Sequence, residues 1–84
     1  MINKGIERKK IMYRATHRGS KEMDLLLGKF VKKIIKDLSY SNLKELEKIL
    51  EIEDEVLFQW FFNKQDSYLI PNNKISQLLR NFKL

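Results

Sequence analysis

The apolar residues between positions 20 and 38 recur at intervals of three and four, which is the spacing of an amphipathic α-helix. Acidic residues stand in the first turn of this segment and lysines in its last turn, as the helix dipole favours. A helix of about five turns with one buried face is therefore predicted from Ser20. Its apolar stripe consists of Met23, Leu26, Leu27, Phe30, Val31, Ile34, Ile35 and Leu38.

Shorter stretches of the same period occupy the rest of the chain. The residues from Asn63 to Asn73 read as a loop, because Pro71 disfavours helix before it and an asparagine can cap the helix that follows. In the last helix, Ile75, Leu78, Leu79 and Phe82 are predicted to share one face. With 84 residues, the chain is predicted to be one all-α domain over residues 1–84, a small five-helix bundle. The four further helices are predicted within residues 3–17, around residues 43–50, over residues 53–63 and from about residue 75.

The composition excludes several classes of site. The chain has no cysteine and one histidine, His17, so thiolate zinc sites, disulfides and multi-histidine metal sites are excluded. No phosphate-binding glycine motif is present, and no apolar run approaches the roughly 20 residues that span a bilayer. The N-terminus also lacks the apolar core of a secretory signal. We therefore expect a cytoplasmic protein without a metal or a stably bound cofactor.

Positive charge is concentrated in the first half of the chain. Residues 1–36 hold eleven Lys or Arg against three Asp or Glu, whereas residues 37–84 hold six against eight. Lysines at positions 29, 32, 33 and 36 form one face of the long helix. This face is either a solvated surface or a set of phosphate contacts, so a small basic nucleic-acid-binding protein is one alternative.

The segment from Arg18 to Asp24 is the first candidate site. Gly19 can be a left-handed cap between two helices, with Glu22 and Asp24 matching the helix dipole. The same residues can also form a binding surface. Gly19 has no side chain and lets a partner's backbone approach closely, and the planar guanidinium group of Arg18 offers several hydrogen-bond donors. The spacing alone leaves both interpretations open. His17 has no nucleophile or carboxylate arranged around it in sequence, which favours an exposed polar side chain.

An aromatic segment near position 60 is the second candidate. Leu57 and Trp60 are predicted to lie in the core of so small a domain. One helix cannot bury every side against a thin core, however. Phe58 or Phe62, if exposed, would then serve as an anchor for a partner.

The two candidates together resemble a known family. Arg18-Gly19-x-x-Glu22-Met23-Asp24 at the start of a long helix, followed by Leu57-Phe58-Gln59-Trp60 after an acidic turn, is similar to the succinate dehydrogenase assembly factor 2 family, called SdhE in bacteria. The resemblance covers roughly residues 8–82. It implies a five-helix FAD assembly factor, not an enzyme, that binds the flavoprotein subunit of succinate dehydrogenase, or in some bacteria of fumarate reductase. Such a factor promotes covalent attachment of the flavoprotein's own FAD by positioning.

The resemblance also implies roles for individual residues. Gly19 would allow close backbone approach, Arg18 would hydrogen-bond the flavoprotein near its flavin, and Glu22 would orient Arg18 or the partner. Asp24 would support them, and His17 and Phe58 complete the expected partner-binding set. Two positions depart from the family pattern, since His17 and Ser20 stand where a basic residue and a methionine are usual. Whether FAD is contacted directly is left open, and an antitoxin-like binding module is a further alternative.

Overall fold

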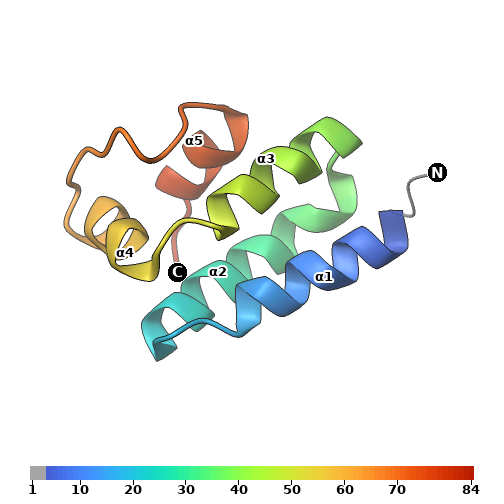
Figure 1. Ribbon diagram of the computed structural model, residues 1–84, viewed down its shortest axis with the longest axis horizontal. Helices are drawn as coiled ribbons and strands as arrows, with labels where there is room; N and C mark the ends of the chain where they lie inside the picture. The colour runs from blue at the N-terminus through green and yellow to red at the C-terminus, as the bar shows by residue number, and fades with distance from the viewer. Residues whose placement is uncertain (1–3) are drawn as a thin grey trace.

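The computed structural model describes residues 4–84 as a bundle of helices (Figure 1). Its elements are α1 (Lys4–Thr16), α2 (Lys21–Ile34), the 3-10 turn η1 (Ile35–Asp37), α3 (Tyr40–Leu50), α4 (Asp54–Phe62) and α5 (Lys74–Arg80). No strand occurs in this part of the chain, so the predicted all-α class and the five helices are confirmed.

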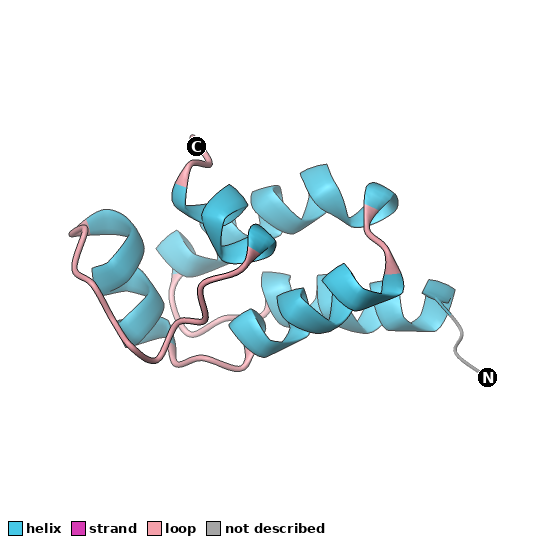
Figure 2. Ribbon diagram, turned by 90° about the horizontal axis from the view of Figure 1, so that it is seen from above, coloured by secondary structure: helices cyan, strands magenta, loops and turns pink. Residues whose placement is uncertain are grey.

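The first three helices run back and forth beside one another, and α5 packs on α3 (Figure 1). The fourth helix lies at the end of the bundle where α1 turns into α2, and the loop over residues 63–73 carries the chain from it to α5 (Figure 2). This arrangement brings the turn between α1 and α2 close to the turn between α3 and α4. No helix among the described residues is both long and apolar enough to cross a bilayer.

The buried face of α2 supplies the centre of the core. Every residue of its predicted stripe is buried except Ile34, which is half-buried. Leu57 and Trp60 of α4 are also buried, which confirms their prediction as core residues. The remaining core comes mostly from one face of each of α1, α3 and α5, and consists of Ile11, Ala15, Leu43, Leu46, Ile49, Leu50, Phe61, Ile70, Ile75 and Leu79.

Two details of the predicted helices are wrong. The long helix does not continue as an α-helix to Leu38 but tightens into η1 after Ile34. There Arg8 of α1 donates from Nε to the carbonyl of Ile35 at 3.3 Å, which satisfies a carbonyl at the end of the helix. In α5, Leu78 is 41% exposed and Ser76 is buried instead. The face that α5 turns to the core therefore runs through Ile75, Ser76 and Leu79.

Side-chain caps set the starts of three helices. The hydroxyl of Ser20 accepts from the amide of Met23 at 3.2 Å, and Ser39 caps α3 in the same way. At α5, Asn73 and Ser76 form a capping box, in which each side chain bonds the other's backbone amide at 2.9 Å. The prediction that an asparagine caps this helix is confirmed.

Replacing Asn73 with alanine should therefore destabilise the protein by about 1 kcal/mol, because the amide of Ser76 loses its acceptor at a short helix. Urea unfolding of the variant and of wild type measures this difference. Asn72→Ala is the matched control, since within residues 4–84 Asn72 bonds only the exposed side chain of Gln77. Equal losses in the two variants would contradict the capping role.

Candidate functional site

The candidate site lies where the turn between α1 and α2 meets the start of α4. Arg18 joins the two regions through its guanidinium group. Its Nη1 donates to the carbonyl of Leu50 at 2.7 Å, and its Nη2 donates to the carbonyl of Ile52 at 3.0 Å. Both carbonyls belong to the end of α3 and the turn that follows it. Arg18 thus satisfies backbone acceptors that the helix end leaves without partners.

Asp54, the first residue of α4, holds both Arg18 and Gly19. Its Oδ1 lies 2.8 Å from Nε and 2.7 Å from Nη2 of Arg18, and its Oδ2 accepts from the amide of Gly19 at 2.8 Å. The carboxylate is also well placed for the dipole of α4. From the other side, Asp24 accepts from the backbone amide of Arg18. Two carboxylates therefore fix the position of the motif.

These contacts place the side chain of Arg18 inside the protein. Only 10% of it is exposed, and Asp54, not Glu22, is the carboxylate that orients it. Glu22 is exposed and forms no hydrogen bond or ion pair within residues 4–84. The expected contact between Arg18 and a partner protein stays a prediction. The geometry gives Arg18 a positioning role, and it leaves Glu22 available for a partner.

The motif borders a cleft of about 380 Å³ between the start of α2 and one face of α4. The cleft brings together three of the predicted site residues, Gly19, Glu22 and Phe58. Phe58 is half-buried and packs against Phe62, with ring centroids 4.8 Å apart. The other residues that line the cleft are Ser20, Met23, Asp54, Glu55 and Gln59.

The backbone of Gly19 lies close to a carboxylate of the same chain, that of Asp54. A Cβ atom at this position would lie 3.3 Å from Oδ2 of Asp54. No glycine among the described residues has a positive φ, so the interpretation of Gly19 as a left-handed cap is wrong. The end of α1 is capped by side chains instead. Thr16 Oγ1 donates to the carbonyl of Met12 at 2.8 Å, and Nδ1 of His17 lies 2.8 Å from the carbonyl of Tyr13.

The other predicted site residues lie outside the cleft. The ring of His17 is stacked on Tyr13, with centroids 3.8 Å apart, on the exposed side of α1. Asp24 turns away from the cleft toward the backbone of Arg18. The structure thus brings Gly19, Glu22 and Phe58 to one surface, whereas the side chain of Arg18 is mostly buried and Asp24 lies outside the cleft.

Sequence reasoning missed Asp54. The acidic run at positions 53–55 indicated the start of a helix, and nothing else marked the middle residue. Asp54 and Arg18 are 36 residues apart, so no local spacing connects them. The only available signal was that a motif arginine at a turn needs a carboxylate partner when it is buried.

The surface of the cleft is suited to binding a protein partner. Met23 and Phe58 supply an apolar floor, and Glu22 and Glu55 leave negative charge at the rim, since Asp54 is paired with Arg18. The hydroxyl of Ser20, which lines the cleft, is occupied as the cap of α2. No group of three potential metal ligands occurs within residues 4–84. This surface fits a partner that presents an apolar side chain next to a basic or amide hydrogen-bond donor.

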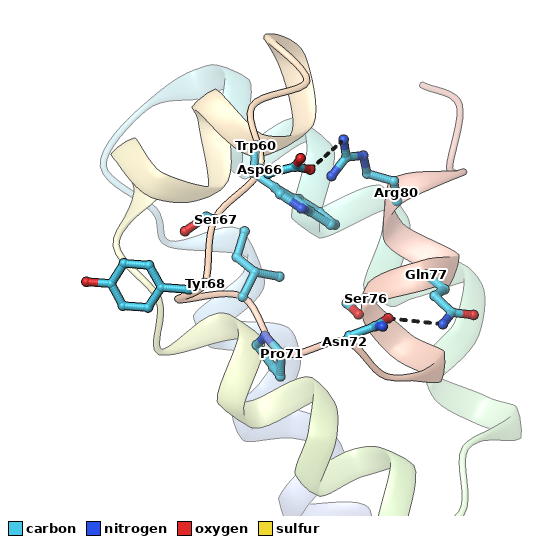
Figure 3. A pocket seen from close by; sticks show the side chains of 10 residues that line it. Trp60, Asp66, Ser67, Tyr68, Pro71, Asn72, Ser76, Gln77 and Arg80 are labelled. Carbon is cyan, nitrogen blue, oxygen red and sulfur yellow. Dashed lines mark hydrogen bonds and ion pairs between the residues drawn. The ribbon is translucent and has the colours of Figure 1, made fainter.

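A second cavity, of about 490 Å³, lies between the loop over residues 66–72 and α5 (Figure 3). Two pairs of its polar side chains contact each other, Asp66 with Arg80 and Asn72 with Gln77. Arg80 lies over the ring of Trp60, 4.9 Å from the centroid, and forms a long ion pair of 3.9 Å with Asp66. Tyr68 points away from these residues. None of the predicted site residues lines this cavity.

Comparison with known proteins identifies the family. A family model described as "Flavinator of succinate dehydrogenase" matches residues 9–83, which include both motifs. The chain belongs to this family. The match favours the assembly-factor interpretation over the nucleic-acid-binding and antitoxin-like alternatives.

Individual relatives carry names that agree with the family. The chain is 33% identical over 78 residues to "FAD assembly factor SdhE" of Acetobacter pasteurianus, an alignment that covers 93% of this chain and 69% of the relative. It is 37% identical over 73 residues to "Succinate dehydrogenase assembly factor 2, mitochondrial" of Dictyostelium discoideum, covering 87% of this chain and 50% of the relative. The protein of the same name in Lodderomyces elongisporus is 32% identical over 79 residues, covering 89% and 48%. The chain thus spans about half the length of these two mitochondrial relatives. No solved structure matches the chain.

Proposed function

We propose that this protein is an FAD assembly factor that binds the flavoprotein subunit of succinate dehydrogenase and promotes covalent attachment of its FAD. The observation that carries the proposal is the family match over residues 9–83. The position of Gly19, Glu22 and the half-buried Phe58 around one cleft supports it. Fumarate reductase, whose flavoprotein is a second client implied by the resemblance, belongs to the same proposal. We place this activity in the bacterial cytoplasm.

The proposed mechanism is positioning without bond chemistry by the factor itself. The motif segment is held by Asp24 and Asp54, and Phe58 stands on the same helix as Asp54. The cleft is therefore preorganised, and binding does not have to order it. A factor that holds the reacting groups of its client in line can raise the rate strongly without an acid or base of its own.

We further propose that FAD is held by the client and is not bound stably by the factor. The negative rim formed by Glu22 and Glu55 would repel the diphosphate of FAD. The same rim attracts basic groups of a protein surface. Equilibrium dialysis of the factor alone with FAD tests this part, and stoichiometric retention of FAD would contradict it.

Covalent flavin on the client provides the test of function. The flavoprotein is co-expressed with the factor in a strain that lacks its own, and flavin fluorescence of the denatured subunit is measured in a gel. We expect fluorescence with wild type and little without the factor. If wild type gives no more than the empty strain with a flavoprotein from the same source, the proposed function is wrong.

Glu22→Gln is expected to lower the initial rate of flavinylation about tenfold, because the variant loses an unpaired rim charge without changing the size of the side chain. The same assay, sampled over time, measures this effect. Asp37→Asn is the matched control, since Asp37 is an exposed acid beyond the other end of α2. An equal loss in both variants would show a general charge effect instead of a contact.

A further inference from the structure

The contact between α1 and α2 leaves an apolar groove of about 600 Å³ on the outside of the bundle. Leu25 of α2 borders it and is 50% exposed, although Leu26 and Leu27, which follow it in the helix, are in the core. Gly28 contributes no side chain, and a Cβ there would lie 3.3 Å from the methyl group of Thr16. The floor of the groove therefore lacks a side chain at position 28, and α1 and α2 lie close together there. The apolar part of the lining is completed by Met12 and Ile35.

One edge of this groove is positively charged. Lys29, Lys32 and Lys36 line it at intervals of three and four along the chain, so they follow one another on the same side. All three are exposed, and none forms an ion pair among the described residues. The acidic residue of the lining, Asp24, is already bonded to the amide of Arg18. The groove thus combines an apolar floor with unpaired cations along one side.

We propose that this groove binds an acidic amphipathic helix of a partner protein. Apolar side chains of that helix would cover Leu25 and the space above Gly28, and its Asp or Glu residues would pair with the lysines. Residues 24–36, which carry the charged and apolar lining from α2 and η1, extend roughly 18 Å at the rise of an α-helix, which is about three turns of a partner helix. The apolar floor disfavours nucleic acid, because phosphates gain nothing from it.

The groove is separate from the cleft beside the motif, since no residue lines both. This inference therefore does not depend on the proposed function. The proposal gives the lysines that line the groove a role in binding, whereas the alternative interpretation treats them as a solvated face. They border an exposed apolar surface that the protein itself leaves uncovered.

A pair of synthetic peptides tests the proposal with the full chain. The first is a fluorescein-labelled 14-residue peptide with leucines at the helical spacing i, i+3, i+4 and i+7 and glutamates elsewhere, and the second has lysines in place of the glutamates. Fluorescence anisotropy should show the acidic peptide binding at least about tenfold more tightly. Lys32→Glu should weaken its binding about tenfold, and Leu25→Ala about fivefold.

Two matched variants serve as controls. Lys48→Glu reverses an exposed lysine on α3, and Leu78→Ala truncates an exposed leucine on α5. Each should change the affinity less than about twofold. All four substitutions are on exposed positions, and circular dichroism confirms that the variants are folded.

Several outcomes would overturn the proposal. Equal binding of the two peptides would contradict the proposed pairing of lysines with acidic residues. Equal effects of Lys32→Glu and Lys48→Glu would show that the peptide does not bind in the groove. Binding of a DNA duplex that is sensitive to Lys32→Glu, without binding of the acidic peptide, would identify a nucleic-acid surface instead. Self-association in sedimentation equilibrium that is lost in Leu25→Ala would show that a second copy of the chain occupies the groove.

Discussion

Gly19→Arg is expected to abolish covalent flavinylation of the client while leaving the helical fold in place. Gly19 is exposed and does not have a positive φ, so its backbone accepts a side chain without strain. The new Cβ would lie 3.3 Å from Oδ2 of Asp54, which requires a small shift of that carboxylate. The rest of the arginine would project at the cleft beside Glu22 and Phe58 and block the approach of a partner. We expect the initial rate to fall at least about 100-fold.

In-gel flavin fluorescence measures the rate, and circular dichroism with thermal melting measures the fold. Gly5→Arg is the matched control, because it places the same side chain at an exposed glycine of α1, far from the cleft along the chain. Gly19→Ala should give an intermediate loss, since it adds only the Cβ. A Gly19→Arg protein that is unfolded, or one that still supports flavinylation, would contradict the surface role of this glycine.

Helical periodicity was sufficient to predict most of the fold because the core of this protein is built from one face of each helix. The stripe of α2 and the caps at Ser20, Ser39 and Asn73 are local properties that a single sequence carries. The face of α5 is not local, because it depends on where α3 lies against it. For this reason Leu78 was predicted to be buried but is exposed, and Ser76 takes a buried position through its capping bonds.

The candidate site was predictable to a smaller extent. Most residues that line the cleft stand in the two motifs, so the sequence pointed to Gly19, Glu22 and Phe58 but not to Asp54. The hydrogen-bond partners of Arg18 were not predictable, because they lie 32 to 36 residues further along the chain. An arginine with an exposed guanidinium group and one with a buried guanidinium group look the same in a sequence. Only the packing of α4 beside the α1–α2 turn distinguishes them.

Removal of the carboxylate at position 54 is the second expected large effect. Asp54→Ala leaves the guanidinium of Arg18, whose side chain is 10% exposed, without its counter-ion and the amide of Gly19 without its acceptor. We expect the free energy of unfolding to fall by about 2 to 4 kcal/mol. Urea unfolding measures it, and Asp66→Ala is the control, because its ion pair with Arg80 is 3.9 Å long and its carboxylate is fully exposed.

A double-mutant cycle then separates positioning from direct contact. If Arg18 acts by holding the motif in place, Arg18→Ala and Asp54→Ala should reduce flavinylation by similar factors, and the double variant should be no worse than either. Arg18→Lys should restore little, since an ammonium group cannot reach Asp54 and the carbonyls of Leu50 and Ile52 together. The assay is run at a temperature at which all variants are folded. A far larger loss in Arg18→Ala than in Asp54→Ala would show instead that the guanidinium itself touches the flavoprotein, because only then does the arginine contribute something that its carboxylate partner does not control.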